Sequence, residues 1–462
     1  MEECDPMNYR VGELIEVTAG DAAHGGWCVA RPDDGPAVFV RHALPGERVR
    51  ARVTEVASRL ARAEAVEILA ASPDRVQPPC PHAVPGGCGG CDWQHASLPA
   101  QRSLKAAVVR QQLRRLAGLE YEVSVEALPG DAEPSQPDGR GGGLGWRTRV
   151  QFAVREDGVA GLHAHRSHQV IDVGRCLIAH PGITALGLTG RRWEGQTSVE
   201  ALIAAESGER AVILTPGRPA RGRTGGTTAG KPRGRPEPTT ARSAAIDGIT
   251  AETVLRRTGR SLAPLRGRGD LNQHAAGRDW RVSAGAFWQV HPGAADALTG
   301  AVLAGLVPQP GDAVLDLYCG AGLFAGVLAP AVGPGGTVIG IEADHAAVRD
   351  ARHNLREWPW AQVRKGDVAA VLRTQGRALA PTRLVVADPP RAGLTREVID
   401  YLGAAENGAE RLAYVSCDPA TLARDIGLLT ERGWVLDGLR AFDAFPMTHH
   451  VECVAVLLAP RS

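Results

Sequence analysis

The sequence contains no uninterrupted run of about 18 apolar residues, which argues against a membrane-spanning helix. It also lacks an excess of either charge. The formal net charge at pH 7 is +1, so total charge gives no reason to expect a nucleic-acid-binding protein. A basic patch is still compatible with this balance, because binding depends on where the charges lie. The 44% hydrophobic and 22% charged residues are ordinary for a soluble globular protein, and 462 residues predict about two to four domains.

A secretory signal is also missing, since the first residues, MEECDPMNYRVGE, are acidic and have no apolar core. We therefore expect a cytoplasmic protein. The nine cysteines are an odd number, which in a cytoplasmic chain argues against a disulfide framework. Such cysteines are more often used for metal binding or for catalysis.

Residues 8–72 form short β-rich segments separated by Gly and Pro-Gly turns. This pattern favours a small five-stranded β-barrel, a shape that often binds oligonucleotides. The segment is also rich in arginine, at Arg41, Arg48, Arg50, Arg52, Arg59 and Arg62. These side chains fit an RNA-binding face and a merely solvated face equally well.

Residues 73–279 begin with a Cys-, Gly- and Pro-rich loop, continue with a helical pattern and then alternate as strands, which predicts a central α+β domain. A Cys-x-x-Cys pair and two further cysteines have spacings that suit either zinc or an iron–sulfur cluster, and the spacing does not choose between them. These candidate ligands are Cys80, Cys88, Cys91 and Cys176. Near 215–243 the sequence is basic and of low complexity, so we expect a disordered insertion that either contacts RNA or is only solvated.

From residue 280 to 462 strands alternate with helices, the pattern of a doubly wound parallel sheet. One strand ends in the turn D-L-Y-C-G-A-G, where Gly320 and Gly322 allow a ligand to approach the backbone. The next strand ends in Glu342, whose carboxylate suits the two hydroxyls of a ribose. The sequence has no G-x-G-x-x-G at this turn, so the pattern favours S-adenosylmethionine over a dinucleotide.

Later strands of the same region end in residues that suit methyl transfer to a pyrimidine. Asp388 precedes two prolines, which stiffen the backbone beside the expected cofactor. Cys417 lies between a strand and a helix, whose positive end favours a thiolate. Thiolate attack on C6 of uracil would make C5 nucleophilic, and Glu452 could then remove the C5 proton. Taken alone, Cys417 also fits a buried small hydrophobe, Glu452 a surface position, and His449 or His450 an alternative base or RNA contact.

The motifs SAGAFWQVHP, DLYCGAGLF, IGIEAD, DPPRAGL, VSCDPATLARD and FPMTHHVE, in this order across residues 280–458, strongly resemble the RNA 5-methyluridine (uracil-C5) methyltransferase family. The N-terminal segment around PGERVRARV looks like a TRAM domain, an RNA-binding module. The resemblance implies an α/β protein with an N-terminal small β-barrel (TRAM/OB-like), a central α+β domain and a C-terminal doubly wound Rossmann-like methyltransferase domain. It implies S-adenosylmethionine-dependent methylation of a uridine in tRNA or rRNA, without indicating which RNA or which uridine. We expect a monomer.

The resemblance also assigns roles by position. It implies that Cys417 is the nucleophile and that Glu452 accepts the proton. It places the cofactor contacts at Gln289, Tyr318, Glu342 and Asp388. His291 stands where the family usually has Asn, which puts only local hydrogen bonding near the cofactor in doubt.

The resemblance further extends to the cysteines, because several family members hold a 4Fe-4S cluster with a similar C-P-H…C-G-G-C motif and a distant G-x-C. It implies a cluster, with zinc as the less favoured alternative, at Cys80, Cys88, Cys91 and Cys176. The first gap is two residues longer than the usual one, which only lengthens a Gly/Pro loop. A cluster so far in sequence from Cys417 is expected to be structural or to order RNA.

Two rival classes stay open. One is a methyltransferase that acts on another base or on an amino group, and the other is a non-catalytic RNA-binding protein that retains the fold. Cytosine-C5 enzymes usually place their cysteine after Pro, whereas Cys417 follows Ser416, and amino-group enzymes need no nucleophile. The joint presence of Cys417, Glu452, Gln289 and Asp388 argues against a loss of catalysis.

Overall fold

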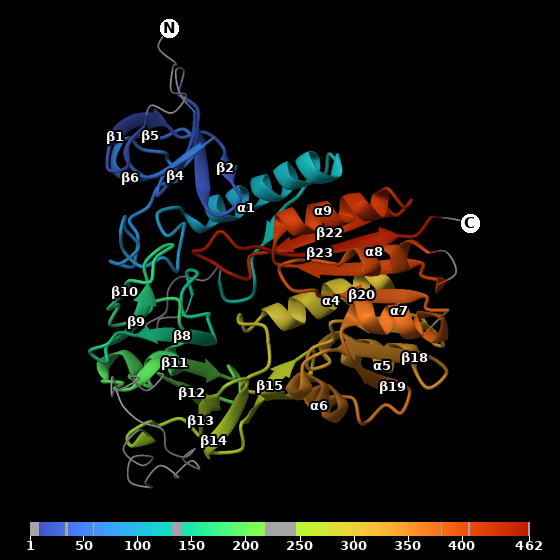
Figure 1. Ribbon diagram of the computed structural model, residues 1–462. Helices are drawn as coiled ribbons and strands as arrows, with labels where there is room; N and C mark the ends of the chain where they lie inside the picture. Colours follow the sequence, from blue (N-terminus) through green and yellow to red (C-terminus); the bar gives the residue numbers. More distant parts are fainter. Residues whose placement is uncertain are drawn as a thin grey trace, which may run out of the picture.

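The protein is built around three large sheets, which Figure 1 shows in blue, green and orange-red. The expected insertion near 215–243 lies outside the described residues, except for 215–217, so its disorder stays a prediction. The computed structural model describes residues 9–32, 36–58, 60–131, 141–217, 246–379, 381–404 and 407–460.

The first sheet, called here the N-terminal sheet, has the strand order β1-β5-β6-β4-β3-β2 and curls around a small apolar core. Alternate residues such as Val38 and Val40 are fully buried, as expected for strands with one face on a core. The predicted strand count of five was wrong, since the described residues form six strands. No pairing joins the two edge strands in this part of the chain, so barrel closure is not shown. The strands are β1 (Leu14–Thr18), β2 (Ala22–Ala23), β3 (Trp27–Ala30), β4 (Ala37–Arg41), β5 (Arg48–Ala57) and β6 (Leu60–Ala70).

The second sheet, called here the central sheet, has the order β10-β9-β8-β11-β12-β13-β14. The short helix α2 (Pro181–Thr184) and a 3-10 turn (Leu188–Gly190) cover its apolar face. A two-stranded hairpin, β15 (Asp270–Ala275) and β16 (Arg278–Ser283), leads from this sheet to the rest of the chain. The strands are β8 (Arg149–Val154), β9 (Ala160–His163), β10 (Val170–Ile171), β11 (Gln196–Ile203), β12 (Arg210–Pro216), β13 (Thr253–Thr258) and β14 (Ser261–Arg266).

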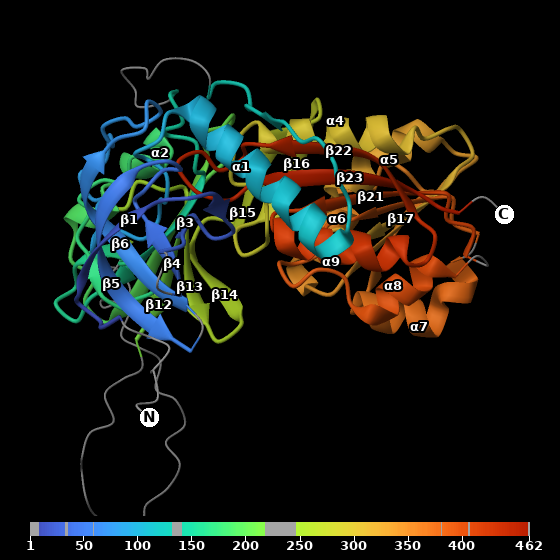
Figure 2. The ribbon, with the colours of Figure 1, turned by 90° about the horizontal axis from the view of Figure 1, so that it is seen from above.

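The segment between the first two sheets crosses to the C-terminal part of the molecule. Helix α1 (Leu98–Gln112) starts at Ser97, whose hydroxyl accepts a hydrogen bond from the backbone N–H of Ala100. It continues as a π-helical turn (Leu113–Ala117) and is followed by β7 (Val125–Glu126), which pairs with the last sheet. Figure 2 shows α1 lying across α9 and the red strands.

The third sheet, called here the C-terminal sheet, has the order β19-β18-β17-β20-β21-β23-β22-β7. Five neighbouring strands from β19 to β21 are parallel, and β23 runs antiparallel to β21. The strands are β17 (Ala313–Leu317), β18 (Thr337–Glu342), β19 (Ala361–Lys365), β20 (Leu384–Ala387), β21 (Arg411–Ser416), β22 (Val435–Phe442) and β23 (Glu452–Leu458). The helices are α4 (Ala294–Leu306), α5 (Leu323–Val332), α6 (His345–Asn354), α7 (Val368–Leu379), α8 (Arg396–Gly403) and α9 (Pro419–Thr430).

Helices cover both faces of this sheet. One apolar cluster joins it to α4, α5 and α6, and another joins it to α1, α7, α8 and α9. A strand that is buried on both faces consists of apolar residues along its whole length. Strand β20 is an example, because all four of its residues are apolar and buried. The predicted doubly wound Rossmann-like fold is thus confirmed.

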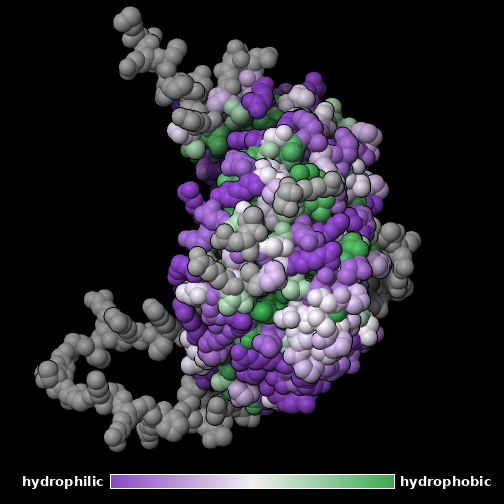
Figure 3. Space-filling model, turned by 90° about the vertical axis from the view of Figure 1, so that its right-hand side faces the viewer, coloured by the Kyte–Doolittle hydropathy of each residue, from purple (hydrophilic) through white to green (hydrophobic). Residues whose placement is uncertain are grey.

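The hydropathy of the surface is consistent with apolar side chains that are packed mainly in the internal cores. On the face that Figure 3 shows, hydrophobic side chains form scattered patches among hydrophilic ones. No helix in the described ranges is both long and apolar enough to pass through a membrane.

Candidate functional site

The candidate site lies at the carboxyl edge of the parallel strands, where strand order reverses. From β17 the chain proceeds outward to β18 and β19 on one side, and then to β20 and β21 on the other. In open α/β sheets this switch point is where ligands bind. Tyr318, Glu342, Asp388 and Cys417 all lie at the carboxyl ends of these strands.

The turn after β17 is shaped by backbone conformations that are rare outside glycine. Tyr318 has a φ of 64°, which is a strained value for an aromatic residue, and Gly320 and Gly322 have φ values of 54° and 89°. Glu342 holds this turn, since its Oε2 accepts a hydrogen bond of 3.0 Å from the Gly320 N–H. Its Oε1 accepts from the N–H of Asp344 at 2.7 Å. A carboxylate with one such bond on each oxygen can still accept bonds from two ribose hydroxyls.

Two further carboxyl groups lie near this turn, the fully buried Asp316 and the partly buried Asp388. Burial raises the pKa of Asp388 to about 7. Burial, together with the nearby charges of Asp388 and Glu342, raises the pKa of Asp316 to about 8, although one oxygen of Asp316 accepts from the Ala325 N–H. The other oxygen of Asp316 has no hydrogen-bond partner among the described residues. Buried acids in this state gain stability from a proton or from a bound cation.

Gln289, the remaining expected cofactor contact, is buried on the segment between β16 and α4. It lines a small cavity with Trp288, Arg149 and Ser283, and that lining contains none of Tyr318, Glu342 or Asp388. The structure therefore places Gln289 on an adjoining segment, where it lines this small cavity.

The residues expected to perform the chemistry are brought together by the pairing of β21 with β23. Ser416 lies opposite Cys453 in this antiparallel register, so the next pair outward is Cys417 and Glu452. Glu452 is buried, and burial raises its pKa well above the ordinary value. Burial, followed by the charge of Glu452, raises the pKa of Cys417 to about 11. The expectation that the positive end of helix α9 favours a thiolate stays a prediction, and burial acts on the thiol in the opposite direction.

Arg391 is a site residue that the sequence did not single out. It directly follows Asp388 and the two prolines, and its guanidinium hydrogen-bonds to Cys417 and lowers the pKa of that thiol. Its Nη2 also lies 3.4 Å from Nε2 of His450. The basic residue after D-P-P was the signal that could have identified it.

The loop that delivers Glu452 is held by side chains from the first part of α1. This loop, residues 443–451, extends in Figure 1 from the C-terminal sheet toward the other two sheets. Gln101 accepts a hydrogen bond from the Met447 N–H at 2.8 Å, and Lys105, which is fully buried, pairs with Asp443. Lys105 also donates to the carbonyl of Phe445 at 3.0 Å. Helix α1 therefore sets where the expected base stands.

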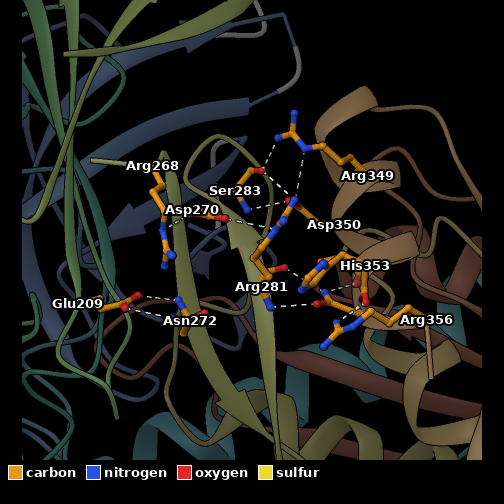
Figure 4. A network of polar contacts seen from close by, with 12 residues as sticks. Glu209, Arg268, Asp270, Asn272, Arg281, Ser283, Arg349, Asp350, His353 and Arg356 are labelled. Carbon is orange, nitrogen blue, oxygen red and sulfur yellow. Dashed lines mark hydrogen bonds and ion pairs between the residues drawn. The ribbon is translucent and has the colours of Figure 1, made fainter. Parts of the chain in front are cut away.

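The hairpin β15–β16 braces the cofactor turn through α6, and Figure 4 shows the contacts between the hairpin and this helix. Asn354 on α6 donates to the carbonyls of Arg281 and Ala321, both at 2.9 Å, and its Oδ1 accepts from the Arg281 N–H at 2.9 Å. The fully buried Asp350 accepts from the N–H of Ser283 at 2.7 Å and from its hydroxyl at 3.0 Å. Since Ala321 lies in the turn after β17, these bonds connect the hairpin to the expected cofactor site.

The four predicted metal ligands line one cavity, together with Arg147 and Arg175. Their thiols are not joined in disulfides, and burial raises the pKa of Cys88, Cys91 and Cys176. Within the described ranges no three His, Cys, Asp or Glu side chains are arranged to hold a single metal ion. The structure thus brings the four cysteines together without showing a metal centre.

Three family models match parts of the chain. A tRNA (uracil-5-)-methyltransferase model matches residues 373–460, and a TRAM domain model matches residues 9–66. A protein-L-isoaspartate(D-aspartate) O-methyltransferase model matches residues 294–370, which run from α4 to β19 and beyond. The first two agree with the resemblance carried by the motifs.

Relatives match over nearly the whole length. An uncharacterized RNA methyltransferase of Streptomyces avermitilis is 49% identical over 97% of this chain and 98% of its own. Another from Bifidobacterium longum is 35% identical over 96% of both chains. The fold is shared with the Pyrococcus abyssi tRNA (uracil-54, C5)-methyltransferase in complex with S-adenosyl-L-homocysteine, with a TM-score of 0.65 and 21% identity over 96% of this chain and 100% of that one. The chain therefore belongs to the RNA methyltransferases of the tRNA (uracil-5-)-methyltransferase family that carry a TRAM domain.

Proposed function

We propose that this enzyme methylates C5 of a uridine in a structured RNA, with Cys417 as nucleophile and Glu452 as base. The observation that carries the proposal is the β21–β23 register, which sets these two side chains next to each other at the ligand edge of the sheet. A methyltransferase acting on an amino group needs no such pair, because the amine is itself nucleophilic.

The reaction needs both residues in turn. Attack of the Cys417 sulfur on C6 forms an S–C6 bond and moves the electrons of the C5–C6 double bond onto C5 and O4. S-adenosylmethionine, when bound, supplies an electrophilic methyl group for the nucleophilic C5. Glu452 then removes the C5 proton, the electrons re-form the double bond, and the S–C6 bond breaks.

The electrostatics of the pair support these roles. Arg391 is the cation that favours loss of the Cys417 proton, against the burial that opposes it. The raised pKa of Glu452 makes its carboxylate a strong base once it is ionised, which suits removal of a proton from carbon. Glu452 is buried and Cys417 is partly buried, which limits the access of water to the covalent intermediate.

For the cofactor, we propose that Glu342 binds the ribose and that Tyr318 and Gln289 complete the pocket. Asp388 lies between β20 and the catalytic pair, so its carboxylate is suited to face the positive sulfonium. The strained Tyr318 backbone and the Glu342–Gly320 bond support a preformed pocket at this turn.

The cysteine cavity fits a 4Fe-4S cluster by the chemistry of its donors, because four free thiols line one buried space. We propose that Cys80, Cys88, Cys91 and Cys176 hold such a cluster. It would tie the loop after β6 to the central sheet and has no role in the steps above. Zinc is the alternative.

RNA binding is proposed for the arginine-rich N-terminal sheet. The division into three units, residues 8–72, 73–279 and 280–462, is proposed as well, with residues 98–126 of the second unit packed on the C-terminal sheet. Whether tRNA or rRNA is modified, a monomeric state and a cytoplasmic location stay predictions.

The experiment that tests the proposal is mass mapping of 5-methyluridine in total RNA from cells with and without this gene. We expect one or a few uridines to lose C5 methylation when the gene is absent, and purified enzyme to restore it. Unchanged 5-methyluridine together with loss of a different methylated base would overturn the proposal.

A further inference from the structure

The turn between β2 and β3 of the N-terminal sheet reaches the segment that carries the nucleophile. Nε2 of His24 lies 3.2 Å from Oδ2 of Asp418, the residue that directly follows Cys417. The other oxygen of Asp418 caps helix α9 by accepting from the N–H groups of Ala420 and Thr421 at 3.0 and 2.9 Å. Asp418 therefore joins the start of α9 to the N-terminal sheet.

A second contact joins the same sheet to the segment that carries the base. Asp92 is buried, and its Oδ1 accepts from Arg41 of β4 at 3.2 Å. Its Oδ2 accepts from Nδ1 of His449 at 2.6 Å and from the His449 N–H at 3.2 Å. His449 lies three residues before Glu452, on the loop whose position decides where that carboxylate stands.

The two contacts meet in one packed junction, formed by His24, Arg41, Asp92, Asp418 and His449. The rings of His24 and His449 lie edge to face, with centroids 6.2 Å apart. Gly26 closes the junction, because its φ is 80° and a Cβ there would lie 2.8 Å from Cβ of Asp92. Only glycine therefore permits the turn to lie so close to Asp92.

We propose that the N-terminal sheet completes the uridine site, with His24 as a positioning residue that holds the Cys417 segment against the Glu452 segment. This inference rests on the proposed function, since it takes Cys417 and Glu452 as the reacting groups. His24 acts through Asp418, and Arg41 acts through Asp92 and His449. The sheet is then a part of the catalytic centre as well as a surface that grips RNA.

The geometry requires this role to affect turnover. The nucleophile follows β21 and the base is the first residue of β23. Their separation therefore depends on two loops, of which one is bonded to the N-terminal sheet through His24 and the other through Asp92 and Arg41. A displacement of about 1 Å between reacting groups lowers rates by up to about a hundredfold. A residue that only grips the RNA backbone would instead change the affinity for RNA.

The test uses full-length enzyme, labelled S-adenosylmethionine and total RNA from cells that lack the gene. For His24→Ala we expect kcat to fall about ten- to a hundredfold with little change in KM for RNA. His24→Gln, which keeps a hydrogen-bond donor for Asp418, should recover most of kcat. Gly26→Ala should lower kcat in the same direction, because the added Cβ pushes the turn away from Asp92.

The matched control is Arg50→Ala on the same sheet, since Arg50 pairs with exposed Glu16 and Glu67 and is not one of the junction residues. Its main effect should be a higher KM for RNA, whereas the main effect of His24→Ala should be a lower kcat. Thermal unfolding of His24→Ala should match the wild type, because the His24 side chain is 38% exposed. A wild-type kcat in His24→Ala, with or without a higher KM, would overturn the inference alone. If the wild-type enzyme makes a methylated nucleoside other than 5-methyluridine, the proposed function is overturned instead.

Discussion

Two groups of carboxyl groups near Cys417 differ in the direction in which their pKa values are shifted. At the cofactor edge burial raises the pKa of Asp316, Asp388 and Glu452. At the junction with the N-terminal sheet the pKa values of Asp92 and Asp418 are lowered. There the hydrogen bonds and charges of His449 and Arg41, or of His24 and the helix N–H groups, outweigh burial.

The difference separates two uses of a buried carboxyl group. At the cofactor edge burial favours the protonated form of each acid, and one oxygen of Asp316 has no hydrogen-bond partner among the described residues, so a proton or a bound cation changes their state. The acids at the junction already have partners, so they act as fixed connections between segments. We infer that the acids at the junction keep their contacts throughout the reaction. The acids at the cofactor edge instead change their protonation state when a ligand binds.

The largest effect should come from the reacting pair. Cys417→Ala should lower methyl transfer about ten-thousand-fold or more, because no other group can form the bond to C6. Glu452→Gln should trap a covalent protein–RNA adduct, since methyl transfer proceeds while the C5 proton stays and the sulfur cannot leave. Gel analysis under denaturing conditions measures the adduct. Normal turnover by either variant would refute the assigned roles.

The next effect concerns the cysteine cavity. Enzyme purified without oxygen should be brown and contain iron and sulfide, and Cys88→Ser or Cys176→Ser should bleach it and destabilise the central part of the chain. The control is Cys28→Ser, because Cys28 is buried in the N-terminal sheet and lies outside that cavity. Iron and sulfide analysis decides the outcome. Stoichiometric zinc without iron would replace the cluster while keeping the four ligands.

The junction itself can be broken from the N-terminal sheet. Arg41→Met should lower the free energy of unfolding by about 3–5 kcal/mol, because it leaves Asp92 and Glu64 without their buried cation. Denaturant unfolding measures this loss. Arg50→Met, whose ion pairs are exposed, should show no measurable change. Equal stabilities for the two variants would mean that the junction is not a fixed connection.

A smaller effect is expected at the brace of the cofactor turn (Figure 4). Asn354→Ala should weaken S-adenosylmethionine binding about ten- to a hundredfold, as is usual when a group that orients a ligand contact is removed. Asn272 lies on the same hairpin but bonds to Glu209 and not to α6, so Asn272→Ala is the control. Calorimetry measures the affinity of both variants for S-adenosylmethionine. Equal affinities would mean that the hairpin has no effect on the cofactor turn.

The parts of this molecule that depend on contiguous motifs could be predicted from the sequence. The D-L-Y-C-G-A-G turn, the terminal Glu342 and the strand ends at Asp388 and Cys417 could be placed at one edge because parallel strands end together. It also grouped the four cysteines that line one cavity.

The junction could not be predicted in the same way. It joins single residues that are far apart in the chain, and Asp92 accepts from Arg41 and His449 across 51 and 357 positions. No local pattern marks such contacts, because they form only when three sheets pack. The strand count of the N-terminal sheet was missed for a related reason: β2 has two residues, too few to show a period.

The smallest effect should be a pH dependence of cofactor binding that comes from Asp388. Its pKa is about 7 in the folded protein, above the ordinary value of 3.8, so this buried acid costs stability as pH rises from about 4 to 7. A sulfonium beside it binds better to the ionised form. S-adenosylmethionine affinity should therefore fall by up to about tenfold from pH 8 to pH 6, because a proton then competes with the ligand.

S-adenosyl-L-homocysteine is the matched ligand, since it has the same groups without the positive sulfur, and its affinity should change much less over this range. In Asp388→Asn the pH dependence should disappear for both ligands, and the free protein should become more stable above pH 7. Asp316, with a pKa of about 8, would be the titrating group if the dependence persisted in Asp388→Asn. Equal pH profiles for the two ligands in the wild type would show that Asp388 does not face the sulfonium, and the contrast between the two groups of acids would then rest on Asp316 and Glu452.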